Sequence, residues 1–425
     1  MSDLNDCFSS VNGRLTVAEA LERFTSGISA VVATESVPLS KANGRIISSD
    51  VKSKKIVPPR DNSAVDGYLV FFDDLSLTGN TTLPVTGRIT AGNPFNRSAR
   101  RGEALSIFTG AQIPYGEGEQ NPDTIFMIED IIRDGNKVTF PSGQIRGSNL
   151  RMAGEDINIG DIVLKCGQKL RPQDVGILAA VGLHSVKVRK RLKVALFSTG
   201  DELREPGDVL QEGAIYDINR FSIQALLRDI GCQIVDLGIL KDSFSTIEDA
   251  LMEAAKENDL VITSGGVSRG EEDHVRKAVE SLGQLHTWNL LIKPGRPIAL
   301  GHILDGIRQV PFIGLPGNPV AVLVTFLRIA RPIILLLSGA SNFVSNTFEV
   351  VSGFDYTKKP GRREWLRAKL ERGDGDILRA VKYPHDGSGI LSSLVYSDGL
   401  VELSEKVTKV NVGEKIQYLP FSGFE

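Results

Sequence analysis

The chain has 425 residues, of which 41% are hydrophobic and 24% are charged, and its formal net charge is −3. This composition is typical of a folded, water-soluble protein, and the length exceeds one ordinary hydrophobic core, so we expect about two to four domains. The near balance of 49 basic and 52 acidic residues gives no electrostatic argument for binding nucleic acid.

Compartment signals favour the cytoplasm. Residues 1–10 are polar and have no apolar segment typical of a secretory signal. The three cysteines lie far apart and match no metal-ligand spacing, which favours buried thiols in a reducing compartment. The longest apolar run, residues 333–337, is too short to span a bilayer. We therefore expect a cytoplasmic protein without membrane contact.

The first half of the chain is expected to be mainly β. A helix is predicted over residues 15–24, where Thr16 and Glu19 have the spacing of a capping box. Apolar residues spaced for a helix recur at 172–181. Short strands separated by Gly, Pro and Asn are predicted at residues 84–89, 104–108, 124–128 and 137–140.

Two polar loops flank these strands. Residues 58–68 contain Asp61 and Asp66 among turn-forming residues, and residues 147–156 contain two acids, Glu155 and Asp156, together with two glycines and Arg151. Loops of this kind carry function more often than core segments do. The first could equally be only a turn, whereas the second is interpreted as a solvated loop unless another domain faces it.

From residue 192 the pattern changes to alternating strands and helices. Strands are predicted at residues 192–198, 233–240, 260–263, 298–300 and 311–315, and helices at 217–230, 245–258, 275–282 and 320–327. This alternation predicts a parallel sheet covered by helices on both faces. Ligands of such sheets bind outside the carboxyl ends of the strands. The residues expected at that edge are Glu202, Asp242, Gly265, Ser268, Asp273 and residues 316–319.

The segment after the strand at 260–263 is the most suggestive. Gly265 and Gly266 would let a phosphate or a flat ring approach the backbone, beside the N–H groups that precede a helix. Acidic residues at 271–273 would place a Mg²⁺ ion next to such a phosphate. A glycine pair after a strand can also be only a tight connection, so the shared edge is needed to favour phosphate binding.

The last part of the chain is expected to be a small β domain. Alternating strands are predicted at residues 348–351, 365–370, 377–382, 399–403 and 415–419. A rigid loop at residues 293–297 supplies Lys293 and Arg296 as possible anion ligands, although exposed cations are usually only solvated. Residues 384–389 form a polar loop that contains Ser388.

Five motifs together resemble one known family. They are DNSAVDGY at 61–68, STGDEL at 198–203, SGGVS at 264–268, KPGRP at 293–297 and LPGNP at 315–319. In kind, order and coverage of the chain they resemble the MoeA family of molybdopterin molybdenumtransferases, which includes the E domain of gephyrin.

The resemblance implies a multidomain α/β plus β fold in a homodimer. It implies a three-layer α/β/α molybdopterin-binding domain with an N-terminal β lasso domain and a C-terminal β-barrel. The implied divisions are residues 1–58 with 148–180 for dimerisation, 59–147 for the lasso, 181–332 for the α/β domain and 333–425 for the barrel.

The resemblance also implies the reaction, a Mg²⁺-dependent insertion of molybdate into adenylylated molybdopterin with release of AMP. Catalytic roles would fall to Asp66, Asp156, Glu202, Asp242 and Asp273, with Asp242 and Asp273 holding the metal. Substrate contacts would come from Thr109, Gly265, Gly266, Ser268, Lys293, Arg296, Pro316, Pro319, Arg367 and Ser388. Asp66 and Asp156 are expected to reach the site across the dimer. Transient partners would be the adenylyltransferase that precedes this step and the molybdoenzymes that follow it.

The chain departs from the family pattern at three positions. Asn289 stands where a lysine is usual, His274 where a tyrosine is usual, and Val65 where a methionine is usual. Loss of one cation puts the detail of the molybdate pocket in doubt. Two other functions stay open, a non-catalytic scaffold and the related adenylyltransferase, and the sequence does not distinguish molybdate from tungstate as the metal source.

Overall fold

The protein is described by a computed structural model that covers residues 8, 14–266, 273–295, 297–373, 375 and 377–424. It divides into two compact units, which are described separately. The larger unit comprises Met1–Ser49, Cys166–Arg171 and Lys187–Glu425, and the smaller comprises Asp50–Lys165 and Pro172–Val186. Strand β12 (Ser185–Arg189) runs from one unit into the other.

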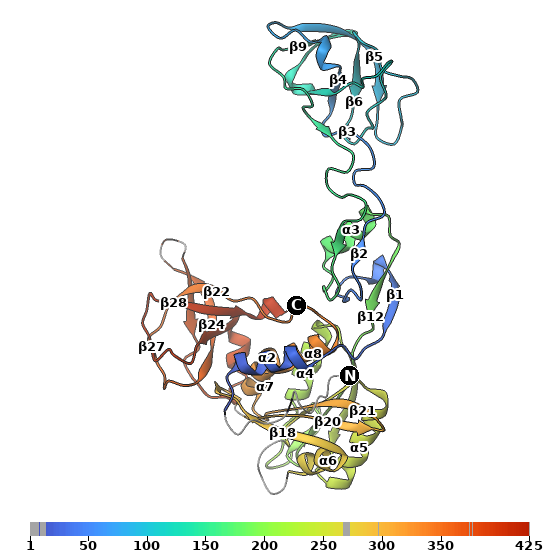
Figure 1. Cartoon of the computed structure of the whole chain (residues 1–425). Coiled ribbons are helices and arrows are strands. Elements are labelled where there is room, and N and C mark those ends of the chain that lie inside the picture. The colour runs from blue at the N-terminus through green and yellow to red at the C-terminus, as the bar shows by residue number, and fades with distance from the viewer. Residues whose placement is uncertain are drawn as a thin grey trace. The chain divides into compact units, whose positions relative to one another are not determined.

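A six-stranded sheet forms the centre of the α/β part of the larger unit, in the order β16-β13-β17-β21-β20-β18 (Figure 1). Its strands are β13 (Lys193–Thr199), β16 (Gln233–Leu240), β17 (Leu260–Ser264), β18 (Gly283–Asn289), β20 (Pro297–Asp305) and β21 (Arg308–Leu315). The first four strands are parallel, as predicted, whereas β20 runs in the opposite direction and pairs antiparallel with both β21 and β18. The reason is a two-residue turn after Asp305, with Gly306 at φ +60°, which reverses the chain between β20 and β21.

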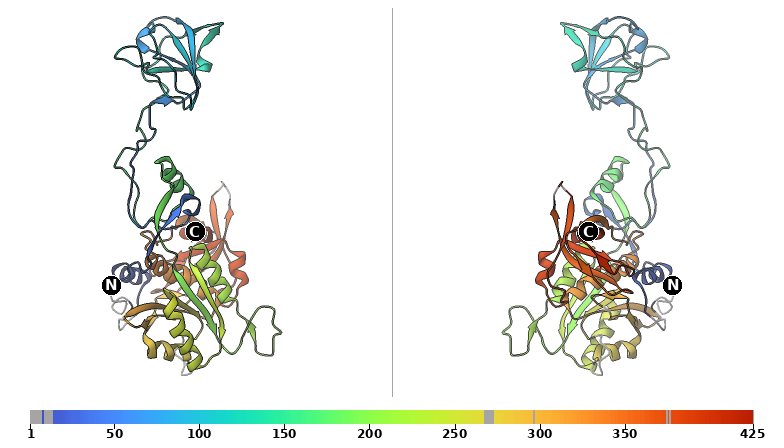
Figure 2. Two further views of the ribbon diagram at one scale, coloured as in Figure 1. Left: turned by 90° about the vertical axis from the view of Figure 1, so that its right-hand side faces the viewer. Right: turned by 90° about the vertical axis from the view of Figure 1, so that its left-hand side faces the viewer.

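Helices cover both faces of this sheet (Figure 2). They are α2 (Val17–Gly27), α4 (Asn219–Asp229), α5 (Phe244–Glu257), α6 (His274–Leu282), α7 (Pro319–Thr325) and α8 (Arg331–Leu337). Alternate residues of β13 face opposite layers, because Val194 and Leu196 pack with α2, α4, α7 and α8, while Ala195 and Phe197 pack with α5 and α6. The predicted three-layer α/β/α arrangement is therefore confirmed.

The helix after β21 is longer than its sequence pattern predicted. It continues from α7 through a π-helical turn, Phe326–Ala330, into α8, and so ends at Leu337 rather than near residue 327. The stretch Pro319–Leu337 is long and apolar enough to span a membrane by length and composition, but 83% of this apolar segment is buried inside the protein. Its apolar character is accounted for by its place in the core.

The C-terminal part of the larger unit is a closed five-stranded barrel, as predicted. The ring consists of β24 (Arg363–Arg372), β25 (Leu378–Lys382), β22 (Phe348–Ser352), β28 (Lys415–Pro420) and β26 (Gly399–Leu403). Pairing of β24 with β26 closes it, and β19 (Ile292–Lys293) adds to the outer side of β24. Nearby elements are β23 (Tyr356–Thr357), β27 (Lys409–Val410) and α9 (Ser392–Tyr396).

The smaller unit is built around a curled six-stranded sheet in the order β7-β4-β6-β5-β9-β8. Its strands are β4 (Gly67–Val70), β5 (Thr81–Ile89), β6 (Ala104–Ile107), β7 (Thr124–Met127), β8 (Ile132–Asp134) and β9 (Lys137–Phe140). Further elements of this unit are β2 (Val51–Lys52), β3 (Asn62–Ser63), β10 (Leu150–Arg151), β11 (Ile162–Leu164) and α3 (Pro172–Ala180).

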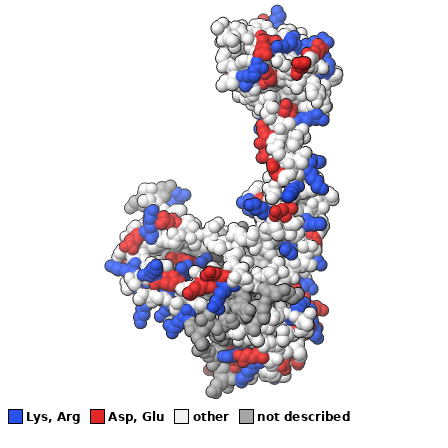
Figure 3. Space-filling view, viewed as in Figure 1, with Lys and Arg blue, Asp and Glu red and all other residues white. Residues whose placement is uncertain are grey.

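The remaining elements of the described chain are short. They are β1 (Thr34–Pro38), β14 (Leu203–Arg204), β15 (Ile215–Tyr216) and 3₁₀ turns at Leu39–Lys41, Phe72–Asp74, Ile128–Asp130 and Phe421–Phe424. Acidic and basic side chains are interspersed on the face of each unit seen in Figure 3.

Helix α2 begins with the predicted capping box. Thr16 Oγ1 accepts a hydrogen bond from Glu19 N at 3.3 Å, and the Glu19 carboxylate accepts one from Thr16 N at 2.7 Å. The helix buries Phe24, whose ring stacks on Trp288 with the centroids 5.3 Å apart. The cap therefore fixes the start of a helix that belongs to the core.

We expect Thr16→Ala to lower the free energy of unfolding of the larger unit by about 1 kcal/mol, because it removes both hydroxyl contacts of the cap. Tryptophan fluorescence during urea unfolding provides the measurement, since Trp288 and Trp365 both lie in this core. Thr25→Ala is the control: the Thr25 hydroxyl only bonds to Leu21 O and Glu22 O within the helix, so its loss should change little. Equal effects of the two variants would contradict the capping role.

Candidate functional site

The strand order places a topological switch point between β13 and β17. From β13 the chain crosses to β16 on one side, and from β16 it returns past β13 to β17 on the other. The connections leaving β13 and β17 therefore diverge, which opens a crevice at their carboxyl ends. Ser198 pairs with Ser264 at this edge, directly before the turns that the sequence singled out.

Gly265 and Gly266 both have left-handed backbone conformations, at φ +88° and +64°. A Cβ on Gly266 would lie 2.6 Å from Val275 Cγ2 and 2.9 Å from Thr199 Cγ2, so only glycine fits between α6 and β13. Gly265 N donates to Leu315 O at 3.1 Å, which ties the turn to β21. The glycines therefore form a rigid, tightly packed turn. Ser268, expected to follow it as a ligand, lies outside the described residues.

Hydroxyl groups at the ends of β13 and β17 are buried in the site edge. Ser198 Oγ, Thr199 Oγ1 and Thr263 Oγ1 have no hydrogen-bond partner among the residues that the structure describes. Ser264 Oγ is 3.5 Å from Pro316 O, at the limit of a hydrogen bond, and links this edge to the loop after β21. Buried polar groups are normally paired, so this concentration marks a place for ligand donors and acceptors.

Three predicted carboxylates lie at the same edge of the sheet. Glu202 is exposed and its carboxylate lies against Gly200, where a Cβ would be only 2.7 Å from Glu202 Oε2. Asp242 is half-buried in the loop after β16. Asp273 is 6% exposed and caps α6, where its Oδ1 accepts from Arg276 N at 3.0 Å. The cap is a structural role that the sequence did not predict.

The donors at this edge fit a Mg²⁺ ion only with help from a substrate. Among the described residues, no group of three or more His, Cys, Asp or Glu side chains is arranged to hold a metal. Mg²⁺ usually takes one or two carboxylates together with substrate phosphate oxygens and water. Asp242 and Asp273, following β16 and β17, offer such carboxylates, so the donor set suits a metal that arrives with a phosphorylated ligand.

A second group of predicted residues gathers at the start of α7. Val320 N donates to Ser388 O at 3.1 Å, so the loop at 384–389 covers the first turn of the helix, beside Pro319. Gly295, at φ +90°, packs against Thr325 and Ala321, which brings the loop after Lys293 to the same helix. Arg296 lies outside the described residues.

Arg367 holds the loop at 384–389 in place. Its guanidinium donates to His385 O at 2.8 Å, to Gly387 O at 3.2 Å and to Ser393 Oγ at 3.0 Å. The side chain is 4% exposed, and this burial lowers the pKa of Arg367 from its usual value. The structure thus shows Arg367 as the support of the loop that contains Ser388.

Lys293 has two polar neighbours that the sequence did not reveal. Its Nζ lies 3.3 Å from Glu364 Oε2 and 3.3 Å from Tyr356 Oη, and Tyr356 Oη donates to the same Glu364 oxygen at 3.0 Å. Lys293 is still 43% exposed, whereas Glu364 is only 5% exposed. The ammonium group is thus supported from one side and accessible from the other.

The smaller unit supplies a second pair of predicted residues. Asp66 Oδ1 accepts from Thr109 N at 2.8 Å and from Thr109 Oγ1 at 2.7 Å. The backbone hydrogen bond, followed by that of the hydroxyl, lowers the pKa of Asp66 from its usual value. Asp156 is also exposed in this unit.

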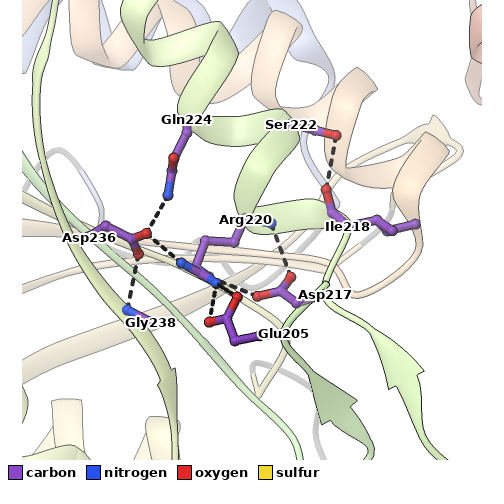
Figure 4. A network of polar contacts seen from close by, with 8 residues as sticks. All are labelled: Glu205, Asp217, Ile218, Arg220, Ser222, Gln224, Asp236 and Gly238. Carbon is purple, nitrogen blue, oxygen red and sulfur yellow. Dashed lines mark hydrogen bonds and ion pairs between the residues drawn. The ribbon is translucent and has the colours of Figure 1, made fainter. Parts of the chain in front are cut away.

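A buried arginine in α4 was not recognised as a site residue from the sequence. Arg220 is 3% exposed and forms ion pairs with Asp217 at 3.0 Å, with Glu205 and with Asp236, while Gln224 Nε2 donates to Asp236 at 2.6 Å (Figure 4). Glu205 and Asp217 flank the excursion between β13 and α4. Arg220 therefore binds both ends of the segment 205–217, which connects β13 to α4 and begins just after Glu202.

Three family models match consecutive parts of the chain. The model described as MoeA N-terminal region (domain I and II) matches residues 15–182, a probable molybdopterin binding domain matches 195–336, and MoeA C-terminal region (domain IV) matches 349–421. The central match covers the glycine turn and the switch point. The fold and this edge thus define a protein with a molybdopterin-binding α/β domain.

Curated relatives and a solved structure agree with these models. The chain is 36% identical to a molybdopterin molybdenumtransferase from Haemophilus influenzae, covering 96% of this chain and 99% of the relative. It is 33% identical to one from Nostoc sp., covering 91% and 88%. The crystal structure of the molybdopterin biosynthesis moeA protein from Pyrococcus horikoshii OT3 matches with a TM-score of 0.79 at 29% identity, over 96% of this chain and 100% of that one.

The chain belongs to the MoeA family of molybdopterin molybdenumtransferases. The resemblance carried by the five sequence motifs is thereby confirmed. The family is one of transferases, so the protein is an enzyme.

We expect Gly266→Ala to destabilise the larger unit by about 1–3 kcal/mol, because a Cβ there meets Val275 and Thr199 in a conformation that favours glycine. Thermal unfolding provides the measurement. Gly317→Ala is the matched control in the neighbouring loop, where a Cβ would meet no atom within 4 Å and φ is not positive. An unchanged melting temperature for Gly266→Ala would contradict the tight packing of the turn.

Proposed function

We propose that the enzyme inserts molybdenum from molybdate into adenylylated molybdopterin and releases AMP in a Mg²⁺-dependent reaction. The observation that carries the proposal is the meeting of two groups at one edge: the glycine turn with its carboxylates, and the Lys293 and Ser388 loops around α7. The contact between Ser264 and Pro316 joins them. Such an edge suits a ligand that has a phosphoanhydride at one end and receives a tetrahedral dianion at the other.

The residues take distinct roles in this proposal. Backbone groups at Gly265 and Gly266, followed by Ser268, bind the phosphorylated pterin. Lys293 and Arg296 attract molybdate, which Ser388 orients, while Arg367 and the prolines Pro316 and Pro319 hold the surrounding loops. Glu202, an exposed carboxylate after β13, would be a further catalytic residue.

Asp242 and Asp273 would hold Mg²⁺ together with oxygens of the substrate pyrophosphate. The bound ion would supply charge neutralisation at the phosphoanhydride when AMP leaves. The protein's own part is to fix both carboxylates in the connections that follow β16 and β17, the two strands on either side of β13, and to keep Asp273 rigid as the cap of α6.

We further propose that the protein acts as a homodimer in the cytoplasm, with residues 1–58 and 148–180 as the dimerisation domain. Asp66, Thr109 and Asp156 then complete the site of the partner subunit. Support comes from the Asp66–Thr109 pair, which is exposed and already charged in a unit separate from the sheet. Contacts with the preceding adenylyltransferase and with recipient molybdoenzymes would be transient.

The first test is AMP release from adenylylated molybdopterin in the presence of Mg²⁺, with and without molybdate. We expect molybdate to stimulate release by the wild type, and Asp273→Asn to reduce the rate at least about a hundredfold. Asparagine caps a helix as well as aspartate does, so this change removes the charge but keeps the cap of α6. Asp249→Asn, an exposed change on α5, is the control for loss of one negative charge.

Equal release by Asp273→Asn and the wild type would remove Asp273 from the mechanism. Absence of release by folded wild-type protein, under conditions in which a family member is active, would contradict the proposed reaction.

The second test is complementation between subunits. Asp66→Asn and Asp273→Asn should each be inactive alone, whereas an equimolar mixture that exchanges subunits should recover about a quarter of the wild-type AMP release, because half of the dimers are mixed and each has one intact site. Mixing Asp242→Asn with Asp273→Asn is the control, since both changes lie in the same unit and leave no intact site. Equal recovery in both mixtures, or in neither, would contradict a site shared between subunits.

A further inference from the structure

The pair of Lys293 and Glu364 is set by the backbone. Strand β19 pairs with β24 in parallel, and Lys293 lies in register with Glu364. Arg363 N also donates to Leu291 O at 2.8 Å, which fixes this register one residue earlier. The carboxylate therefore stays next to the lysine without depending on a flexible loop.

The surroundings of Glu364 keep its carboxylate buried and held. Tyr356 donates its hydroxyl to Glu364 Oε2 at 3.0 Å, and burial raises the pKa of Tyr356 well above its usual value, so the phenol stays a neutral donor. Lys382 Nζ lies 5.7 Å from the centroid of the Tyr356 ring and bonds to Asp386 at 2.7 Å. A polar chain thus runs from Lys293 to the loop that contains Ser388.

Lys293 contacts protein groups on one side and is open to an anion on the other. Two of its three possible donor directions face Tyr356 and Glu364, and the 43% exposed side chain remains open to solvent on the other side. An anion that binds Lys293 Nζ must lie within a few ångströms of the Glu364 carboxylate, which is 5% exposed and therefore weakly screened.

We propose that Glu364 sets the affinity of the molybdate site by partly neutralising Lys293, so that a tetrahedral dianion binds weakly and reversibly. The carboxylate repels the dianion that the ammonium attracts. Glu364 is in this sense an affinity-determining residue that acts through Lys293. The inference rests on the proposed function in so far as molybdate is the anion.

The test measures binding of molybdate, and separately of sulfate, to the full-length protein by titration calorimetry. Glu364→Gln keeps an acceptor for Lys293 and Tyr356 but removes the charge, so we expect both dianions to bind on the order of three- to tenfold more tightly. Glu349→Gln is the matched control, because this exposed barrel glutamate pairs with Lys415 and its loss changes the net charge equally. It should leave both dissociation constants unchanged.

A double-mutant cycle assigns the effect to the lysine. In the Lys293→Gln background, Glu364→Gln should tighten binding much less than in the wild-type background. Thermal unfolding of every variant shows whether the fold is retained. If Glu364 only supported the structure, its replacement would weaken binding of the dianions. If the change in net charge alone were responsible, Glu349→Gln would tighten binding as well.

Weaker or unchanged dianion binding by Glu364→Gln overturns the inference, as does absence of dianion binding by both the wild type and Glu364→Gln. Tighter binding of both dianions combined with no molybdate-stimulated AMP release supports the anion site and contradicts the proposed reaction. The two failures are therefore distinguishable.

Discussion

Burial of the helical stretch Pro319–Leu337 is the constraint on which the larger unit depends. The stretch packs against the sheet, α2 and the barrel in one hydrophobic core that includes Trp365. Its first turn meets the loop of Ser388, and its side at Ala321 and Thr325 meets Gly295. A buried helix cannot shift without opening cavities. It therefore holds the loop of Ser388 and the loop of Gly295 in fixed positions relative to each other.

The joint between this helix and the barrel is polar at one point. Arg328, in the π-helical turn, pairs with Glu402 at 3.2 Å and lies 5.7 Å from the centroid of the Trp365 ring. Glu402 also accepts from Arg363 at 2.7 Å and from Trp365 Nε1 at 2.8 Å. Burial lowers the pKa of Arg328. A buried ion pair adds little net stability but strongly disfavours misaligned packing, so we interpret it as fixing the register between helix and barrel.

The sequence predicted the parts of the fold that depend on short-range patterns. The capping box of α2, the parallel strands and the glycine turn after β17 are all encoded within about ten consecutive residues, where periodicity and turn chemistry act. Strand β18 was not predicted, because its antiparallel pairing with β20 joins two segments that no local pattern links. The helix was predicted to end near residue 327, whereas it continues to Leu337 and accommodates Pro332 in the first turn of α8.

The candidate site was predicted unevenly for the same reason. Residues in the loops at strand ends were found, since their place follows from the strand order. Glu364 and Tyr356 were not, because their contact with Lys293 joins positions 71 and 63 residues apart through a β19–β24 pairing that no local pattern encodes. Arg220 was missed since an arginine on an amphipathic helix is normally exposed. Its burial becomes intelligible only when Glu205, Asp217 and Asp236 converge on it.

Three of the charged residues that the sequence predicted share one property, which is that each is already paired within the protein. Lys293 has Glu364, Asp66 has Thr109, and Asp273 has the N-terminus of α6. Pairing holds each group in a fixed orientation, which reduces the reorganisation needed when charge develops in a reaction. It also limits how strongly a single charged substrate can bind. Tight binding then requires several groups of the same unit to act on one ligand together.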